Sequence, residues 1–113
     1  MVSPSAGAVV LLRFPFSDLS SAKLRPAIVL ASAGHDDWIL CQVTSNPYAD
    51  PSAIRIEETD FAQGSLRRIS YARPGKLFTA NTSLMVALIG NLKAESHQGV
   101  VAAVVKLLEA SRS

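Results

Sequence analysis

Short apolar runs separated by polar turns fill most of the chain, which is typical of a mainly β protein. The runs at 27–31 and 38–43 are apolar at nearly every position, so we expect central strands covered on both faces. Residues 53–57 alternate isoleucine with charged side chains, as a half-exposed strand does. The other expected extended segments are 8–14, 69–72, 76–79 and 85–89.

One long segment, residues 94–110, has helical spacing. Residues 58–61 are expected to form a single helical turn that ends at Gly64, and Pro74-Gly75 indicates a turn or bulge between two extended pieces. Short strands followed by one helix predict a small barrel of curved antiparallel sheet with the C-terminal helix packed on it. The helical stripe that should face the core consists of Val100, Val101, Val104, Val105, Leu107 and Leu108.

The composition adds bounds to this picture. With 113 residues, 49% of them hydrophobic, the chain can build one ordinary core, so we expect a flexible tail at 1–6 and a single domain at 7–113. A mean hydropathy of +0.26 predicts more apolar surface than a small monomer hides, which favours an oligomer. A single cysteine, Cys41, and the absence of a signal-like or membrane-spanning run predict a soluble cytoplasmic protein.

Charge is distributed unevenly along the chain. Residues 36–60 contain six acids and one base, whereas residues 61–94 contain five bases and no acid. Residues 19–35 add Lys23 and Arg25 without an acid. Unpaired basic segments are the usual electrostatic signature of a nucleic-acid ligand, although a solvated basic face gives the same pattern.

The most informative local feature is Arg25-Pro26 at the start of an apolar strand. Proline restricts the residue before it to an extended conformation, so the Arg25 guanidinium, which suits phosphate, should be well held. If the next strand pairs antiparallel through the turn at 32–36, its polar end, Thr44-Ser45, lies beside Arg25. The alternatives are an ion pair between Arg25 and Asp18, and a capping role for Thr44-Ser45 at the Asn46-Pro47 turn.

Other kinds of active site lack support in the sequence. No Cys/His cluster has metal-ligand spacing, and there is no glycine-rich phosphate loop or serine elbow. His35 and His97 are far apart, and the run from His35 to Asp37 is explained by a polar turn. We therefore expect neither a metal nor a cofactor.

An ordered series of segments resembles the MazF/PemK toxins of bacterial toxin-antitoxin pairs. The resemblance spans residues 7–110. It is carried by 7–18, 23–30 with Arg25-Pro26, 40–45 with Thr44-Ser45, Gly64-Ser65-Leu66, Arg73 with 76–79, and Ile89-Gly90-Asn91-Leu92.

This resemblance implies an SH3-like barrel, a homodimer and a cognate antitoxin, with DNA contacted only through that antitoxin. It also implies a metal-independent endoribonuclease that cuts single-stranded RNA, including mRNA, at short sequences. Attack by the 2′-hydroxyl would leave a 2′,3′-cyclic phosphate and a 5′-hydroxyl. The implied catalytic pair is Arg25 and Thr44; the expected substrate contacts are Phe14, Ser17, Lys23, Ser45, Asn46, Arg73 and Lys76.

Two departures from the family pattern concern proton transfer. Some family members use an arginine at the position of Arg73 near the scissile phosphate and place an aspartate two residues later, where this chain has Gly75. Members also often carry a glutamate or histidine in the loop at 17–24, which here offers neither. No proton acceptor is therefore assigned. The rival readings are a catalytically inactive nucleic-acid-binding module and a CcdB-like gyrase inhibitor, although the tryptophan-containing tail of the latter is missing, since Trp38 is internal.

Overall fold

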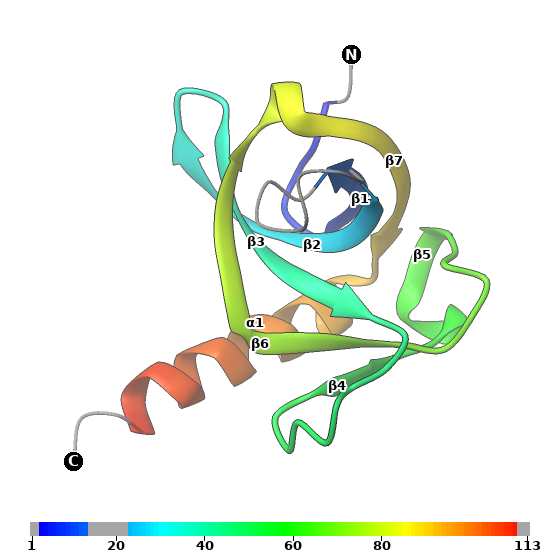
Figure 1. Ribbon diagram of the computed structural model, residues 1–113, viewed down its shortest axis with the longest axis vertical. Helices are drawn as coiled ribbons and strands as arrows, with labels where there is room; N and C mark the ends of the chain where they lie inside the picture. Colours follow the sequence, from blue (N-terminus) through cyan, green and yellow to red (C-terminus); the bar gives the residue numbers. More distant parts are fainter. Residues whose placement is uncertain (1–2, 14–22, 111–113) are drawn as a thin grey trace.

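A single curled antiparallel sheet forms most of the molecule, with one helix packed against it (Figure 1). The structure is a computed structural model that describes residues 3–13 and 23–110, so Phe14 and Ser17 lie outside the described residues. The strand order is β4-β6-β3-β2-β1-β7-β5. The strands are β1 (Ala8–Arg13), β2 (Leu24–Gly34), β3 (Asp37–Thr44), β4 (Ile54–Ile56), β5 (Phe61–Gly64), β6 (Ser70–Asn81) and β7 (Met85–Leu92), followed by α1 (Ala94–Ala110).

The expected hairpin between the two most apolar strands is confirmed. β2 and β3 are antiparallel, with Ala27 opposite Gln42, so the start of β2 lies beside the end of β3. The turn is tighter than the expected 32–36 segment because only His35 and Asp36 separate the strands, with φ of 54° and 63°. Two successive positive φ values match the twist of the flanking strands, which allows both strands to extend further.

The central strands are covered on both faces, as their continuous apolar pattern predicts. On one face, Val9, Ile28 and Cys41 pack in a cluster that includes Val100 and Val104 of α1. Side chains of the opposite pleat fill the inside of the curl: Ala8, Val10, Leu12, Ala27, Val29, Leu40, Ala80 and Met85. A barrel interior and a helix-covered outer face therefore share the same strands.

Several element boundaries differ from expectation. Of the turn or bulge expected at Pro74-Gly75, the structure has the bulge, since the register with β3 shifts between Cys41 and Val43; the two extended pieces around it are one strand, β6. Gly90 likewise lies within β7. The short turn at η1 (Glu58–Asp60) is confirmed, but the residues after it form β5.

The apolar stripe of α1 is buried only in part. Val100 and Val104 are core residues, whereas Val105, Leu107 and Leu108 are exposed. The reason is geometric, since the C-terminal half of α1 extends beyond the sheet (Figure 1). Amphipathic spacing identified the helix but did not indicate at which residue the sheet stops covering its apolar side.

A close glycine contact holds β5, an edge strand of the sheet, against β7. Gly64 pairs with Gly90, and Gly64 has a φ of +74°. A Cβ on Gly64 would lie 2.1 Å from the carbonyl oxygen of Ile89, so no larger residue fits without moving the backbone. This approach fixes where the chain leaves β5.

Candidate functional site

An open groove of about 500 Å³ lies where β2 begins and β3 ends. One wall is formed by the first residues of β2 and the last residues of β3, and the other by the segment that connects β5 to β6. Its polar and aromatic lining consists of Lys23, Arg25, Thr44, Ser45, Tyr48, Ser65, Arg67, Arg68 and Ser70. Segments that are distant in sequence thus form one surface.

Arg25 and Thr44, the expected pair, both line this groove. Arg25 is the second residue of β2 and lies opposite Leu12 of β1. Thr44 is 9% exposed, and its Oγ1 accepts a hydrogen bond of 3.2 Å from the N–H of Asn46. The capping role considered for Thr44 is therefore present, and its hydroxyl proton remains available for donation because the oxygen is the acceptor in that contact.

The opposite wall contains functional candidates that the sequence did not single out. Arg67 and Arg68 are exposed and line the groove. Arg67 has a φ of 62°, and its N–H donates to Ser65 Oγ at 2.8 Å, which holds the turn. Their signal in the sequence was the acid-free basic stretch, but the pairings of β5 with β7 and of β6 with β3 are what bring them into the same groove lining as Arg25.

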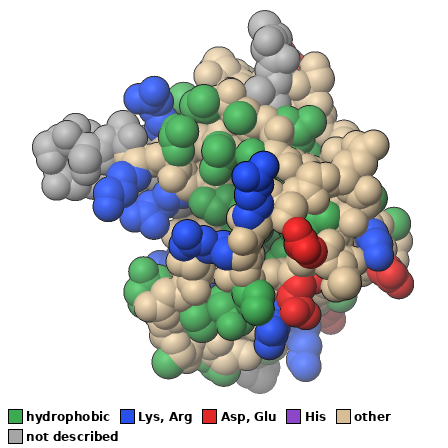
Figure 2. Space-filling model, turned by 90° about the vertical axis from the view of Figure 1, so that its right-hand side faces the viewer, with side chains coloured by type: hydrophobic (Ala, Val, Ile, Leu, Met, Phe, Trp, Pro, Cys, Tyr) green, Lys and Arg blue, Asp and Glu red, His purple; other side chains and the backbone are tan. Residues whose placement is uncertain are grey.

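The electrostatic character of the groove is uniform among the described residues. Four basic side chains line it and no acidic one does: Lys23, Arg25, Arg67 and Arg68. Figure 2 shows blue basic side chains around an apolar area of this face, with red acidic side chains gathered to one side. Such a surface suits a polyanion with apolar parts.

Three of the expected substrate contacts lie outside the groove lining. Asn46 is exposed, and its side-chain oxygen accepts the N–H of Tyr48 at 2.9 Å. The Nε of Arg73 donates to Asp50 Oδ2 at 3.1 Å. Lys76 is exposed on β6, beyond the bulge.

The carboxylate of Asp50 is stabilised in its charged form. The N–H of Ser52 donates to Asp50 Oδ1 at 2.9 Å, and this bond, followed by the bond from Arg73, lowers the pKa of Asp50 below its ordinary value. The Asp50 carboxylate therefore stays ionised at neutral pH. Its side chains are only 19% and 16% exposed for Arg73 and Asp50.

Cys41 lies behind the bulge of β6 and away from the groove. Its thiol is buried and donates to the carbonyl oxygen of Arg73 at 3.2 Å. Burial raises the pKa of this thiol to about 12, which makes it a poor nucleophile.

Neither a metal cluster nor a membrane-spanning helix is found in the part of the chain that the structure describes. Within residues 3–13 and 23–110, no group of three or more His, Cys, Asp or Glu side chains is arranged to hold a metal ion. Over the same residues, no helix has the length and apolar character needed to cross a bilayer.

The family follows from the whole-chain match. The sequence model for the PemK-like, MazF-like toxins of type II toxin-antitoxin systems matches residues 5–108. The chain belongs to this family. No curated protein sequence matches this PemK/MazF-like chain.

Solved structures share the PemK/MazF-like fold at low sequence identity. A MazE-MazF structure from Deinococcus radiodurans has a TM-score of 0.73 at 21% identity, covering 94% of this chain and 96% of that one. A mycobacterial endoribonuclease bound to its cognate antitoxin gives 0.72 at 12%, covering 96% of both chains. A MazF toxin from Mycobacterium tuberculosis gives 0.69 at 12%, covering 90% and 96%. At these identities the likeness establishes the fold, and the expected curved barrel with a C-terminal helix is confirmed.

Proposed function

We propose that this PemK/MazF-like toxin is a metal-independent endoribonuclease that cuts single-stranded RNA, including mRNA, at short specific sequences. The observation that carries the proposal is the groove, which combines four basic side chains with the hydroxyls of Thr44 and Ser45 and has no acid among its described lining residues. Family membership supports it, and structural neighbours that are endoribonucleases share the fold.

In the proposed mechanism, RNA supplies its own nucleophile. The 2′-hydroxyl attacks the adjacent phosphorus, the bond to the 5′ oxygen of the next nucleotide breaks, and the products are a 2′,3′-cyclic phosphate and a 5′-hydroxyl. The Arg25 guanidinium stabilises the negative charge that develops on the phosphorane. The Thr44 hydroxyl donates to one of its oxygens.

The remaining groove residues position the strand. Lys23, Ser45, Arg67 and Arg68 are suited to hold the phosphates that flank the scissile one, because such contacts fix the register of a nucleic acid without reading its bases. Asn46, Arg73 and Lys76 stay predicted substrate contacts, as do Phe14 and Ser17.

The proposal includes partners and a setting. We expect a homodimer, a cytoplasmic location, a single toxin domain at 7–113 and a cognate antitoxin through which any DNA contact is made. Structural neighbours include MazF bound to MazE. The antitoxin should be sought as a small acidic protein encoded next to this chain.

Cleavage of a mixed single-stranded RNA by purified protein in EDTA tests the proposal. Arg25→Ala should reduce the rate by a factor of about 100 or more, because one group that stabilises transition-state charge typically contributes that much. Arg55→Ala is the matched control, since Arg55 is exposed on β4 and paired with Glu57 outside the groove. Metal-dependent cleavage, or equal rates for Arg25→Ala and wild type, contradicts the proposal.

A catalytically inactive RNA-binding module is the second candidate function. It is favoured by one specific observation: no Asp, Glu or His lines the described part of the groove, so no proton acceptor is at hand there. It predicts salt-sensitive RNA binding with no cleavage products. Gel-shift and cleavage assays on the same RNA distinguish the two functions.

A further inference from the structure

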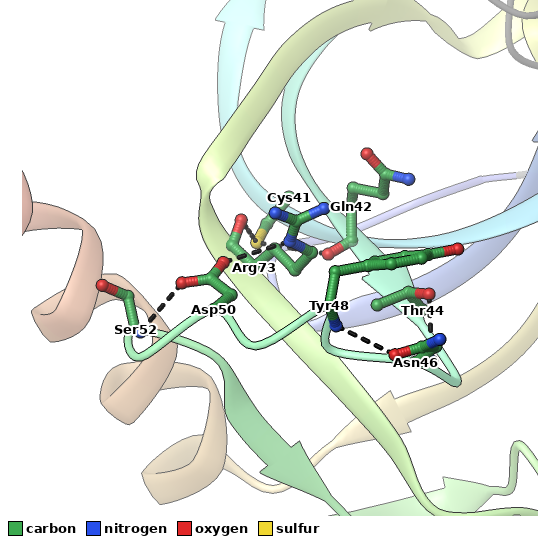
Figure 3. A network of polar contacts seen from close by, with 8 residues as sticks. All are labelled: Cys41, Gln42, Thr44, Asn46, Tyr48, Asp50, Ser52 and Arg73. Carbon is green, nitrogen blue, oxygen red and sulfur yellow. Dashed lines mark hydrogen bonds and ion pairs between the residues drawn. The ribbon is translucent and has the colours of Figure 1, made fainter.

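Tyr48 is the only aromatic side chain among the described residues that line the groove. It is 64% exposed, the highest value among the exposed large hydrophobic side chains described. Figure 3 shows its ring extending from the loop after β3 toward Thr44. An aromatic ring kept in water beside a basic groove has no role in the core.

The backbone that presents Tyr48 is strained. Tyr48 and Ala49 have φ of 53° and 57°, in the left-handed region that side chains other than glycine seldom adopt. Such conformations persist only when their surroundings hold them, and they concentrate at binding sites. The loop therefore holds the tyrosine in a defined position.

Successive hydrogen bonds along this loop stabilise its conformation. Thr44 Oγ1 accepts from Asn46 N–H, and Asn46 Oδ1 accepts from Tyr48 N–H, so the loop is anchored at the end of β3 (Figure 3). The N–H of Asp50 then donates to the carbonyl of Pro47 at 2.9 Å. Asn46 thus links the position of Tyr48 to that of Thr44.

The Arg73–Asp50 ion pair supports the ring from β6. The guanidinium carbon of Arg73 lies 5.6 Å from the centroid of the Tyr48 ring, within the range of a cation–π contact. Asp50 fixes the guanidinium through its Nε. Arg73 thus lies over the ring, while most of the Tyr48 side chain stays exposed and lines the groove.

We propose that Tyr48 is a stacking platform for a nucleobase next to the scissile phosphate, and that Arg73 and Asp50 are positioning residues that hold it. Single-stranded RNA is recognised largely through stacking of splayed bases on aromatic rings. The inference rests on the proposed function, because it places a base beside the position where that function places the scissile phosphate. It also gives Arg73 a use compatible with its ion pair.

Binding of a non-cleavable RNA tests the platform separately from catalysis. The probe is a fluorescent single-stranded RNA that wild type binds, made with 2′-O-methyl riboses, and a set of its variants with one abasic position each. Tyr48→Leu should weaken binding by about 5-fold to 150-fold, the usual worth of one stacked base, whereas Tyr48→Phe should bind as wild type does. One abasic position should weaken wild type similarly and leave Tyr48→Leu unaffected.

Asp50→Asn separates positioning from simple charge. It removes an acid, so a purely electrostatic role predicts tighter RNA binding; a positioning role predicts weaker binding and loss of the abasic effect. The asparagine oxygen can still accept the Ser52 N–H, so the loop turn is retained. Adding Asp50→Asn to Tyr48→Leu should cause no further loss.

The outcomes separate the two proposals. If wild type cleaves RNA but Tyr48→Leu binds as tightly and shows the same abasic effect, the platform is wrong and the proposed function stands. If wild type binds through Tyr48 without cleaving, the platform stands and the nuclease proposal is wrong. Absence of RNA binding by wild type overturns both.

Discussion

The salt dependence of RNA binding can be worked out from the groove lining. Each phosphate neutralised on a single strand contributes about −0.7 to the slope of log affinity against log salt. Four basic side chains line the groove, so we expect a slope of about −2.8 for each groove and a loss of about 50-fold between 50 and 200 mM salt. Arg68→Ala should reduce the slope to about −2.1 and that loss to about 20-fold.

Fluorescence anisotropy with a 2′-O-methyl single-stranded RNA at four or five salt concentrations measures these slopes. Arg68→Lys should retain the wild-type slope because it retains the charge, and Arg55→Ala should retain it because Arg55 lies outside the groove. A wild-type slope shallower than about −1 refutes the reasoning. So does an Arg55→Ala variant whose slope changes as much as that of Arg68→Ala, since binding would then lack a defined groove.

Three further predictions concern the fold and its titrating groups. Gly64→Ala should lower the melting temperature by about 10 °C or more, because the added Cβ would meet the Ile89 carbonyl oxygen. Gly34 also has a positive φ, but a Cβ there meets nothing within 4 Å, so Gly34→Ala should lower the free energy of unfolding by only about 1 kcal/mol. Calorimetry of both variants checks this, and equal losses contradict it. Cys41 should resist alkylation by iodoacetamide at pH 8 until urea unfolds the chain, because burial raises its thiol pKa to about 12; labelling of the native protein at the unfolded rate is the contrary result. The pKa of Asp50 is lowered in the folded state, so its contribution to the free energy of unfolding should be complete above its unfolded pKa of about 3.9 and should disappear as the pH falls through the folded value. The melting temperatures of wild type and Asp50→Asn should therefore differ at pH 5 to 8 and converge in acid. A constant difference at every pH counts against this prediction.

Local sequence rules were enough for the features that depend on neighbouring residues. The bounds of the helix at 94–110 follow from its apolar spacing, and the pairing of β2 with β3 follows from two apolar runs around a polar turn. Once that hairpin is assumed, Arg25 and Thr44 must lie near each other. The groove lining in the structure is consistent with this expectation.

What the sequence did not reveal depends on long-range pairing and on special backbone conformations. Arg67 and Arg68 reach the groove because β5 pairs with β7 and β6 pairs with β3, and no local pattern marks these pairings. Tyr48 was missed because its importance comes from a left-handed loop conformation and from Arg73, which is contributed by a bulged strand. The proline and glycine of that bulge suggested an interruption where the strand in fact continues.

The sheet order has a consequence for how the groove comes into being. β4 and β5 are joined by η1 alone, yet they stand at opposite ends of the strand order (Figure 1). The wall that contains Arg67 and Arg68 is attached to the sheet through β7, which in turn pairs with β1, the first strand. During synthesis on the ribosome, β2 and β3 emerge early, but β5 can pair with β7 only after Leu92 has left the exit tunnel. The groove is therefore completed only after most of the chain has been translated.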